Sequence, residues 1–363
     1  MLMKRLLATL ILLLLLPAPP VPAHAALPGT GGSAPHPITF PADAAMHPSA
    51  NVEWWYFVGH LADTAGHTYG FEVTFFKFSG LRRSFPASSV DVALRTDVAI
   101  TDETARRFYH DITYVPMAPP RTMVSTRELR LRAGTISIWT LGRLSYSLHG
   151  RLPRGSVDLA VTSLRPPMLV HGGFLNFAFG YTYYYSLTHM HAVGTLTIAG
   201  RRIPVQGLAW MDHQWGNSAG DAVRGWDWMA LQLDDQTDLS LTNERTAAGV
   251  VRWAMALLPD GRQVFVPGAL ITPLGQWRSP TTGVVYPSGW HVRVPGLRLD
   301  VVVRPTVRDQ EMADSLVVSG YRSSYWEGSG TVVGTRAGHE VTGKAYTELT
   351  GYGTPPPSLH VQP

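Results

Sequence analysis

Nine residues near the middle of the chain, AWMDHQWGN at positions 209–217, combine an acid, an imidazole, amides and two indoles. On a β-strand they alternate between two faces, with Trp210, Asp212 and Gln214 on one and Met211, His213 and Trp215 on the other. A carboxylic acid in an apolar pocket stays protonated and can donate its proton. An indole face stabilises a nearby cation by about 2 kcal/mol when water is excluded. We therefore predict Asp212 as a candidate catalytic acid.

Two further acids stand next to aromatic residues. Glu53 precedes the aromatic run in NVEWWYFVGH, and Glu327 ends the segment YRSSYWE. Each is a candidate proton donor, and Glu53 is also a candidate base that directs water. The neighbouring rings that we predict to line a site for an apolar ligand are Trp54, Trp55, Tyr56, His213, Trp215, Trp228, Tyr325 and Trp326.

Each of these features also has a structural interpretation. Asp212 is suited to hydrogen bonds that join two parts of a fold, and Trp54 and Trp55 are suited to plug the end of a β-barrel. His189 and His191 would share a strand face as half of a zinc site, but paired surface histidines are commoner than metal sites. We therefore expect no metal.

Several classes of function lack the residues they need. The sequence has no Cys, no G-x-S-x-G motif and no glycine loop for phosphate. Disulfides, thiolate metal sites and the usual hydrolase nucleophiles are therefore excluded. The formal net charge is +4, and removal of an N-terminal peptide that contains Lys4 and Arg5 would bring it nearer to zero. That charge gives no electrostatic case for binding nucleic acid.

The two ends of the chain differ from the rest in composition. Two basic residues, the apolar run Leu6–Leu16 and the A-x-A site Ala23–Ala25 predict a cleaved signal peptide over residues 1–25. We therefore expect a secreted or periplasmic protein. Residues 26–46, rich in Gly, Pro and Ala, are predicted to be a flexible lead-in, and residues 356–363 a disordered tail.

The sequence between these ends is predicted to be nearly all β. EWWYFVGHL alternates in polarity, a turn follows, and YGFEVTFFKF returns as a second aromatic strand, which is typical of a β-hairpin. Further strand-like runs follow, and no segment after the signal peptide sustains a helical period over a dozen residues. The frequent Gly (35) and Pro (28) favour many short strands joined by turns.

An internal repeat organises these strands. GTLTIAGRRIPVQGLAWMD recurs as GTVVGTRAGHEVTGKAYTE, 136 residues later in one ungapped register. In that register Asp212 aligns with Glu348, whereas Glu327 aligns with His191. We predict two copies of one β-domain, each an antiparallel barrel of eight to ten strands, at residues 47–217 and 220–355.

Six segments together resemble the carotenoid 1,2-hydratase (hydroxyneurosporene synthase) and AttH-like family of secreted, lipocalin-like proteins. In chain order they are HPSANVEWWYFVGHL, YGFEVTFFKF, AWMDHQWGN, GWDWMALQLDD, SGYRSSYWEGSGTVVG and GKAYTELTGYG. The resemblance covers about residues 46–355. It implies an all-β fold of two tandem lipocalin-like, calycin-type antiparallel β-barrels packed side by side. A hydratase of this family would add water across a terminal isoprenoid double bond without a cofactor.

Two functions of different classes follow. We expect an exported lipocalin-like protein that binds an apolar, isoprenoid or lipid-like ligand. As an enzyme it would be a cofactor-free hydro-lyase or cyclase that uses acid catalysis. The alternative is a non-catalytic lipid carrier or accessory protein of an extracytoplasmic export system, with its partner in that system or at the membrane surface. A buried acid among the ligand-lining rings favours the enzyme, and a large dry pocket without an acid favours the carrier.

Overall fold

The protein is described by a computed structural model that covers residues 35–80, 91–177, 180–218, 223–246, 249–314, 317–318 and 321–353. The predicted signal peptide and the predicted tail lie outside these residues. As the sequence predicts, the described chain is built almost entirely of antiparallel strands. Its helical segments are two short 3₁₀ turns, η1 (Ala42–Ala44) and η2 (Pro295–Leu297). In this described part, no helix is long and apolar enough to cross a membrane.

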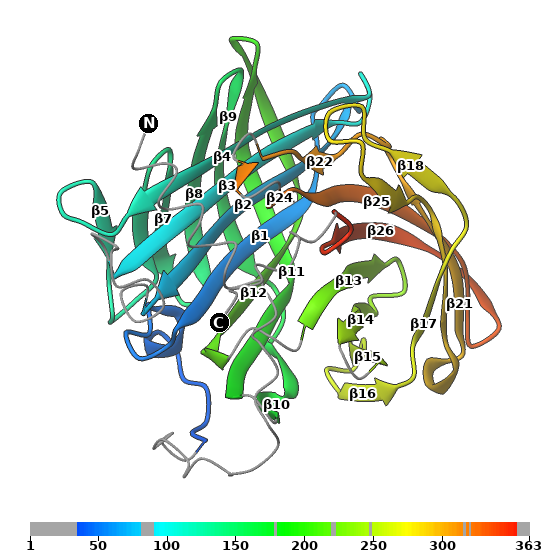
Figure 1. Cartoon of the computed structure of the whole chain (residues 1–363). Coiled ribbons are helices and arrows are strands. Elements are labelled where there is room, and N and C mark those ends of the chain that lie inside the picture. The colour runs from blue at the N-terminus through cyan, green and yellow to red at the C-terminus, as the bar shows by residue number, and fades with distance from the viewer. Residues whose placement is uncertain are drawn as a thin grey trace, which may run out of the picture.

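The first sheet has twelve strands and curves into a nearly closed barrel (Figure 1). Its strands are β1 (Val52–Ala62), β2 (Thr68–Ser79), β3 (Val92–Asp102), β4 (Arg107–Pro116), β5 (Thr122–Val124), β6 (Arg130–Ala133), β7 (Ile136–Gly142), β8 (Ser145–Leu152), β9 (Gly155–Ser163), β10 (Met168–Phe177), β11 (Gly180–Ile198) and β12 (Arg201–Ser218). Its first strand, β1, pairs with its last, β12. The short strands β5 and β6 and the side strand β10 take it beyond the expected eight to ten strands.

The second sheet has ten strands and forms a half-barrel. Its strands are β13 (Val223–Leu233), β14 (Asp238–Thr246), β15 (Gly249–Leu257), β16 (Gln263–Pro267), β17 (Leu270–Pro273), β20 (Trp290–Val294), β21 (Leu299–Pro305), β22 (Glu311–Met312), β25 (Tyr325–Arg336) and β26 (His339–Leu349). Two small ribbons join β18 (Gln276–Arg278) to β19 (Val285–Pro287) and β23 (Val317–Val318) to β24 (Tyr321–Arg322). Here too the first strand, β13, pairs with the last, β26.

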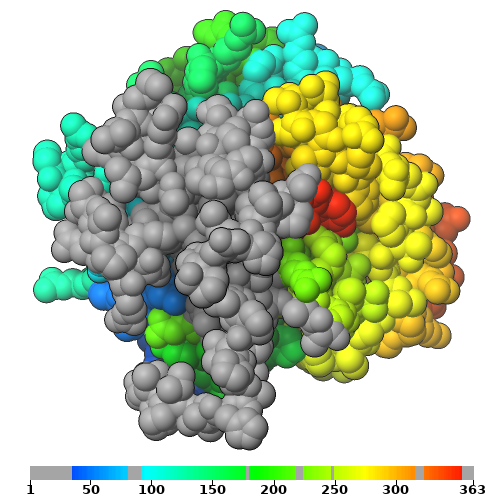
Figure 2. Space-filling view, viewed as in Figure 1, coloured from blue at the N-terminus to red at the C-terminus, as the bar shows by residue number. Residues whose placement is uncertain are grey.

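The two sheets pack against each other along their central strands. β26 contacts β1 and β25 contacts β2; in Figure 1 both strands begin near the first barrel and lead away from it, and in Figure 2 the yellow segments of the second sheet form one side of the molecule. Alternation in β1 explains how both of its faces become buried. Trp55 and Phe57 point into the first barrel, whereas Tyr56 and Val58 join a hydrophobic cluster shared with the second sheet.

The pairing reproduces the repeat in the last strand of each copy. Asp212 lies opposite Tyr56 on the first strand of its sheet, and Glu348 lies opposite Trp228 in the same way. The offset of 136 residues between β12 and β26 therefore relates equivalent positions.

The preceding strand follows a different offset, which corrects one expectation. Glu327 lies directly opposite Glu348, and Ser186 lies directly opposite Asp212. Glu327 therefore corresponds to Ser186 and not to His191. The reason is that the hairpin from Glu327 to Glu348 is five residues shorter than the hairpin from Ser186 to Asp212.

The end of the predicted lead-in packs onto the first barrel. Asp43, Ala44 and Met46 are buried, and the carbonyl of Ala44 accepts a hydrogen bond of 3.0 Å from the indole N–H of Trp55. The segment before β1 is therefore buried against the first barrel from Asp43 to Met46.

Candidate active site between the two sheets

An aromatic cluster fills the contact between the sheets. The ring of Trp228 on β13 meets Tyr56 on β1 edge-to-face at 5.4 Å, and it meets Trp210 on β12 at 6.0 Å. Trp253 and Tyr346 extend the cluster on the side of the second sheet. Such rings exclude water and present negative faces to a cation.

Two glutamates face each other at the edge of this cluster. Glu327 on β25 and Glu348 on β26 are directly opposite, and Glu327 is fully buried whereas Glu348 is partly exposed. The hydroxyl of Tyr56 donates to Glu327 Oε1 at 2.6 Å, across the contact between the sheets. Trp226 Nε1 donates to Glu348 Oε2 at 2.8 Å. Glu327 Oε2 has no hydrogen-bond partner among the described residues.

The surroundings of Glu327 and Glu348 give the two carboxyl groups different pKa values. Burial, together with the charges of Glu72 and Glu348, holds the pKa of Glu327 well above its usual range. Burial raises the pKa of Glu348 to about 7, and the charge of Asp212 adds to the shift. Two carboxyls in one site cannot both ionise easily, so Glu327 is the neutral acid and Glu348 the member that ionises near neutral pH.

Asp212 lies on the interface side of β12, as the alternation in AWMDHQWGN predicts. Its carboxylate accepts hydrogen bonds from Tyr184 OH at 2.6 Å and from Trp210 Nε1 at 2.7 Å. Burial raises the pKa of Asp212 to about 6. Both of its oxygens are thus already bound by hydrogen-bond donors, which fits a supporting position better than that of a free proton donor.

Glu72, like Glu327, is a neutral acid at the contact between the sheets, and its hydrogen bonds explain why. Tyr325 OH lies 2.9 Å from Glu72 Oε1 and 2.7 Å from Asp97 Oδ2, but a phenol has one proton to donate. Asp97 receives it as a carboxylate, because Arg95 forms an ion pair with Asp97 at 2.7 Å. Glu72 then satisfies the contact by donating its own proton. In agreement, burial and the charge of Asp97 raise the pKa of Glu72 to about 8.

A close approach of β2 and β25 brings these acids together. A Cβ on Gly70 would lie 2.8 Å from the Cβ of Ser329, so only glycine fits at this crossing. Glu72 and Glu327 each lie two residues from it along their strands, and therefore on the same faces as Gly70 and Ser329.

Glu53 lies elsewhere, in the first barrel. Its carboxylate contacts His47, His213 and Lys77, with Lys77 Nζ at 2.9 Å from Oε2. Hydrogen bonds from both histidines and the ammonium charge lower its pKa to about 2, against the effect of burial. Glu53 is thus a carboxylate at neutral pH and not a proton donor.

The predicted ligand-lining residues divide between these places. Tyr56, Trp228 and Tyr325 lie at the interface, and the partly buried Trp54 packs beside the same aromatic cluster. The residues packed inside the first barrel are Trp55, His213 and Trp215. Trp326 lies in the core of the second sheet and donates its indole N–H to Arg308 O at 2.8 Å.

His189 and His191, the two histidines that could form half of a zinc site, lie in different surroundings. His189 Nδ1 lies 3.3 Å from Asp238 Oδ1, and the same carboxylate accepts hydrogen bonds from Arg165 at 2.9 Å and Thr188 at 2.8 Å. His191 is exposed on β11. His189 therefore belongs to a polar contact between the two sheets.

Sequence patterns do not identify several of the interface residues. Glu348 stands out only as the counterpart of Asp212 in the repeat, and Glu72, Asp97 and Tyr184 do not stand out. A usable signal for Glu72 was an acid at an alternating position within the aromatic strand YGFEVTFFKF. The approach of β2 to β25 joins residues about 250 positions apart, and local patterns carry no information on such pairs.

Comparisons with known proteins agree with this architecture. The AttH-like family model matches residues 32–352. A candidate AttH from Nitrosomonas europaea is 26% identical, with 93% of this chain and 100% of that chain covered and a TM-score of 0.77. A comparison with curated proteins found no match.

Two more distant structures share the fold. Kievitone hydratase from Nectria haematococca is 18% identical over 86% of this chain and 93% of its own, with a TM-score of 0.68. CghA with Sch210972 is 13% identical over 85% of this chain and 93% of its own, with a TM-score of 0.52. At these identities the likeness concerns the fold alone. The family model, in contrast, spans nearly all of the described residues, and the chain therefore belongs to the AttH-like family.

Proposed function

We propose that this protein is a cofactor-free hydro-lyase that adds water to an alkene of an apolar, isoprenoid or lipid-like compound at the contact between the two sheets. The observation that carries the proposal is the pair of Glu327, a buried neutral acid, and Glu348, a partly exposed acid that ionises near neutral pH. We also propose that it acts outside the cytoplasm, as the signal-peptide pattern predicts.

The pair accounts for every proton of a hydration. Glu327 donates its proton to one alkene carbon, which leaves a carbocation on the other carbon and a carboxylate at Glu327. A water molecule attacks the cation as Glu348 accepts one of its protons. Transfer of that proton from Glu348 to Glu327 restores the starting state, so alkene and water become an alcohol without a redox partner.

The surroundings suit the charge that develops. Tyr56, Trp210 and Trp228 pack in one cluster, and the Tyr56 hydroxyl binds Glu327. A desolvated contact between an aromatic face and a carbocation is worth about 2 kcal/mol or more. Asp212 adds negative charge on the same side of β12. The name of the related kievitone hydratase describes a hydration on this fold, which supports the reaction class proposed here.

The test is incorporation of labelled oxygen. Full-length protein is incubated with acyclic isoprenoids such as squalene and lycopene in H₂¹⁸O, and ¹⁸O-labelled tertiary alcohol is measured by mass spectrometry. Glu327→Gln should abolish the product. Glu311→Gln should retain it, because Glu311 is a buried glutamate of the second sheet whose carboxylate is bound by hydroxyls of Ser279, Thr282 and Tyr286.

The same experiment separates the enzyme from the carrier. Unchanged isoprenoid that co-purifies with the wild type, with no ¹⁸O product from any compound of the panel, would contradict the hydro-lyase and favour the lipid carrier. Product formed equally well by Glu327→Gln would show that this acid is not the proton donor.

A further inference from the structure

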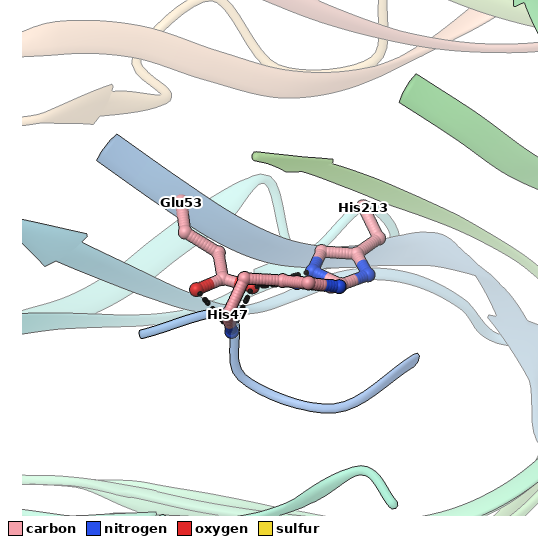
Figure 3. Close-up of side chains that lie close together, drawn as sticks. All are labelled: His47, Glu53 and His213. Carbon is pink, nitrogen blue, oxygen red and sulfur yellow. Dashed lines mark hydrogen bonds and ion pairs between the residues drawn. The ribbon is translucent and has the colours of Figure 1, made fainter. Parts of the chain in front are cut away.

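We propose that His47, Glu53 and His213 bind one divalent transition-metal ion of the zinc type, which fastens the segment before β1 to the first barrel. The three side chains come from that segment, from β1 and from β12, and they converge on one point inside the barrel (Figure 3). Two imidazoles and a carboxylate are ligands that suit zinc and neighbouring metals.

Two of the distances between these ligand atoms are slightly shorter than those around a bound metal ion. His47 Nδ1 lies 2.7 Å and His213 Nε2 lies 3.1 Å from Glu53 Oε1. One ligand atom from each residue lies within 4.8 Å of the other two. Ligands at about 2.0–2.1 Å from a tetrahedral zinc ion are roughly 3.3 Å apart. To admit the ion, the His47–Glu53 pair at 2.7 Å and the His213–Glu53 pair at 3.1 Å would both have to open slightly.

Both histidines already have the outer contacts that metal ligands use. The second ring nitrogen of His47, Nε2, lies 3.3 Å from the carboxylate of Asp43. The second ring nitrogen of His213, Nδ1, lies 3.1 Å from the backbone carbonyl of Asp43. Contacts of this kind orient metal-binding imidazoles and leave their other nitrogen directed at the ion.

The protons at His213 provide an independent argument. Its two ring nitrogens face two acceptors, the carbonyl of Asp43 and the carboxylate of Glu53, whereas a neutral imidazole has one N–H. Either tautomer leaves a lone pair directed at an oxygen. A metal ion between Nε2 and Glu53 Oε1 would take the Nε2 lone pair, and Nδ1–H would then donate to the carbonyl of Asp43.

The surroundings hold the ligands in place. Lys77 binds Glu53 Oε2 and leaves Oε1 directed at the histidines. The ring of His47 stacks on Trp215 at 4.1 Å and 3°, and the ring of His213 stacks on Trp55 at 4.8 Å. Only the side chain of His47 among the three ligands reaches solvent, at 17% exposure, which marks the side of entry.

The site is separate from the proposed hydration chemistry. His213 follows Asp212 in β12, but the two side chains lie on opposite faces of the strand, one in the barrel and one at the interface. The sequence predicted His213 as a ligand-lining residue and did not connect it with His47, which lies 166 positions earlier.

The test uses untagged, full-length protein freed of metal with EDTA and titrated with Zn²⁺. Wild type is expected to bind one equivalent, measured by calorimetry and elemental analysis, and its Tm should rise with Zn²⁺ concentration. His47→Ala should lose both effects. The control His149→Ala, which removes a partly exposed histidine paired with Asp158, should keep them.

Cobalt provides a readout that needs no variant. Co²⁺ bound by two imidazoles and a carboxylate should give the visible d–d bands of a four- or five-coordinate ion in the wild type. Stoichiometric Zn²⁺ binding that survives in folded His47→Ala, or a Co²⁺ spectrum identical to that of the aqueous ion, would overturn the proposal. So would a wild-type protein that binds no equivalent of Zn²⁺.

Discussion

At the scale of single residues, neighbouring groups shift the pKa values of the buried acids in opposite directions. Glu53 is surrounded by cationic and N–H donors and loses its proton, whereas Glu327 faces other acids in a buried place and keeps it. The three acids predicted from sequence, Asp212, Glu53 and Glu327, all stand next to aromatic residues. Only their tertiary contacts distinguish which of them keeps its proton. Aromatic neighbours in sequence therefore indicate burial but not protonation state.

The role of Glu348 predicts a pH dependence of the reaction. The base must be ionised, so the hydration rate should rise with pH through a limb near 7, the value to which burial raises this pKa. In Glu348→Gln the rate should fall about 10²–10⁴-fold, the usual contribution of a positioned acid or base, and the limb should disappear. The measurement is kcat/KM from pH 5 to 9, and a limb that survives the substitution would assign it to another group.

At the scale of elements, alternation along strands was predictable and contacts between strands were not. The two faces of AWMDHQWGN follow from the period of two, and the structure confirms that Trp210 and Asp212 lie on one face and His213 and Trp215 on the other. The register of the hairpin that carries Glu327 was not predictable from the repeat, because its length changed between the copies.

The crossing of β2 and β25 provides a prediction about these elements. Gly70→Ala places a methyl group 2.8 Å from the Cβ of Ser329 and should destabilise the protein by about 1–3 kcal/mol, as overpacking does. Ser329→Gly in the same chain should restore much of that loss. The measurement is the free energy of urea unfolding.

Gly142→Ala is the matched control, because a Cβ there would meet nothing within 4 Å. A Gly70→Ala variant as stable as this control would show that the two strands do not approach as closely as described.

At the scale of the whole molecule, the fold was predictable because its signals are repeated along the chain. Short alternating strands, turns and a repeat of 136 residues indicate two β-units, and each sheet does join its first strand to its last. The contact between the sheets depends on side chains far apart in sequence, such as Tyr56 and Glu327. That contact is where the candidate active site lies, so the site was less predictable than the fold.

The buried acids predict how global stability depends on pH. The pKa of Asp212 is raised to about 6 and that of Glu72 to about 8, so the folded state binds their protons more tightly than the unfolded state does. Their contribution is complete below about pH 4 and is lost as pH rises through 6 to 8. For Asp212 the shift corresponds to about 3 kcal/mol.

The free energy of urea unfolding should therefore fall between pH 5 and 8, and Asp212→Asn should flatten part of that slope. Stability that rises with pH over this range, or an unchanged slope in the variant, would contradict the raised pKa values of these two acids.

The most direct test of the central claim is the protonation state of Glu327 at neutral pH. Infrared difference spectra of wild type against Glu327→Gln in D₂O report the C=O stretch of a protonated carboxylic acid separately from carboxylate bands. The structure predicts a carboxylic-acid band at pH 7 that is missing in the variant and present in Glu311→Gln. A wild-type spectrum in which Glu327 contributes only carboxylate bands at pH 7 would contradict its role as the proton donor.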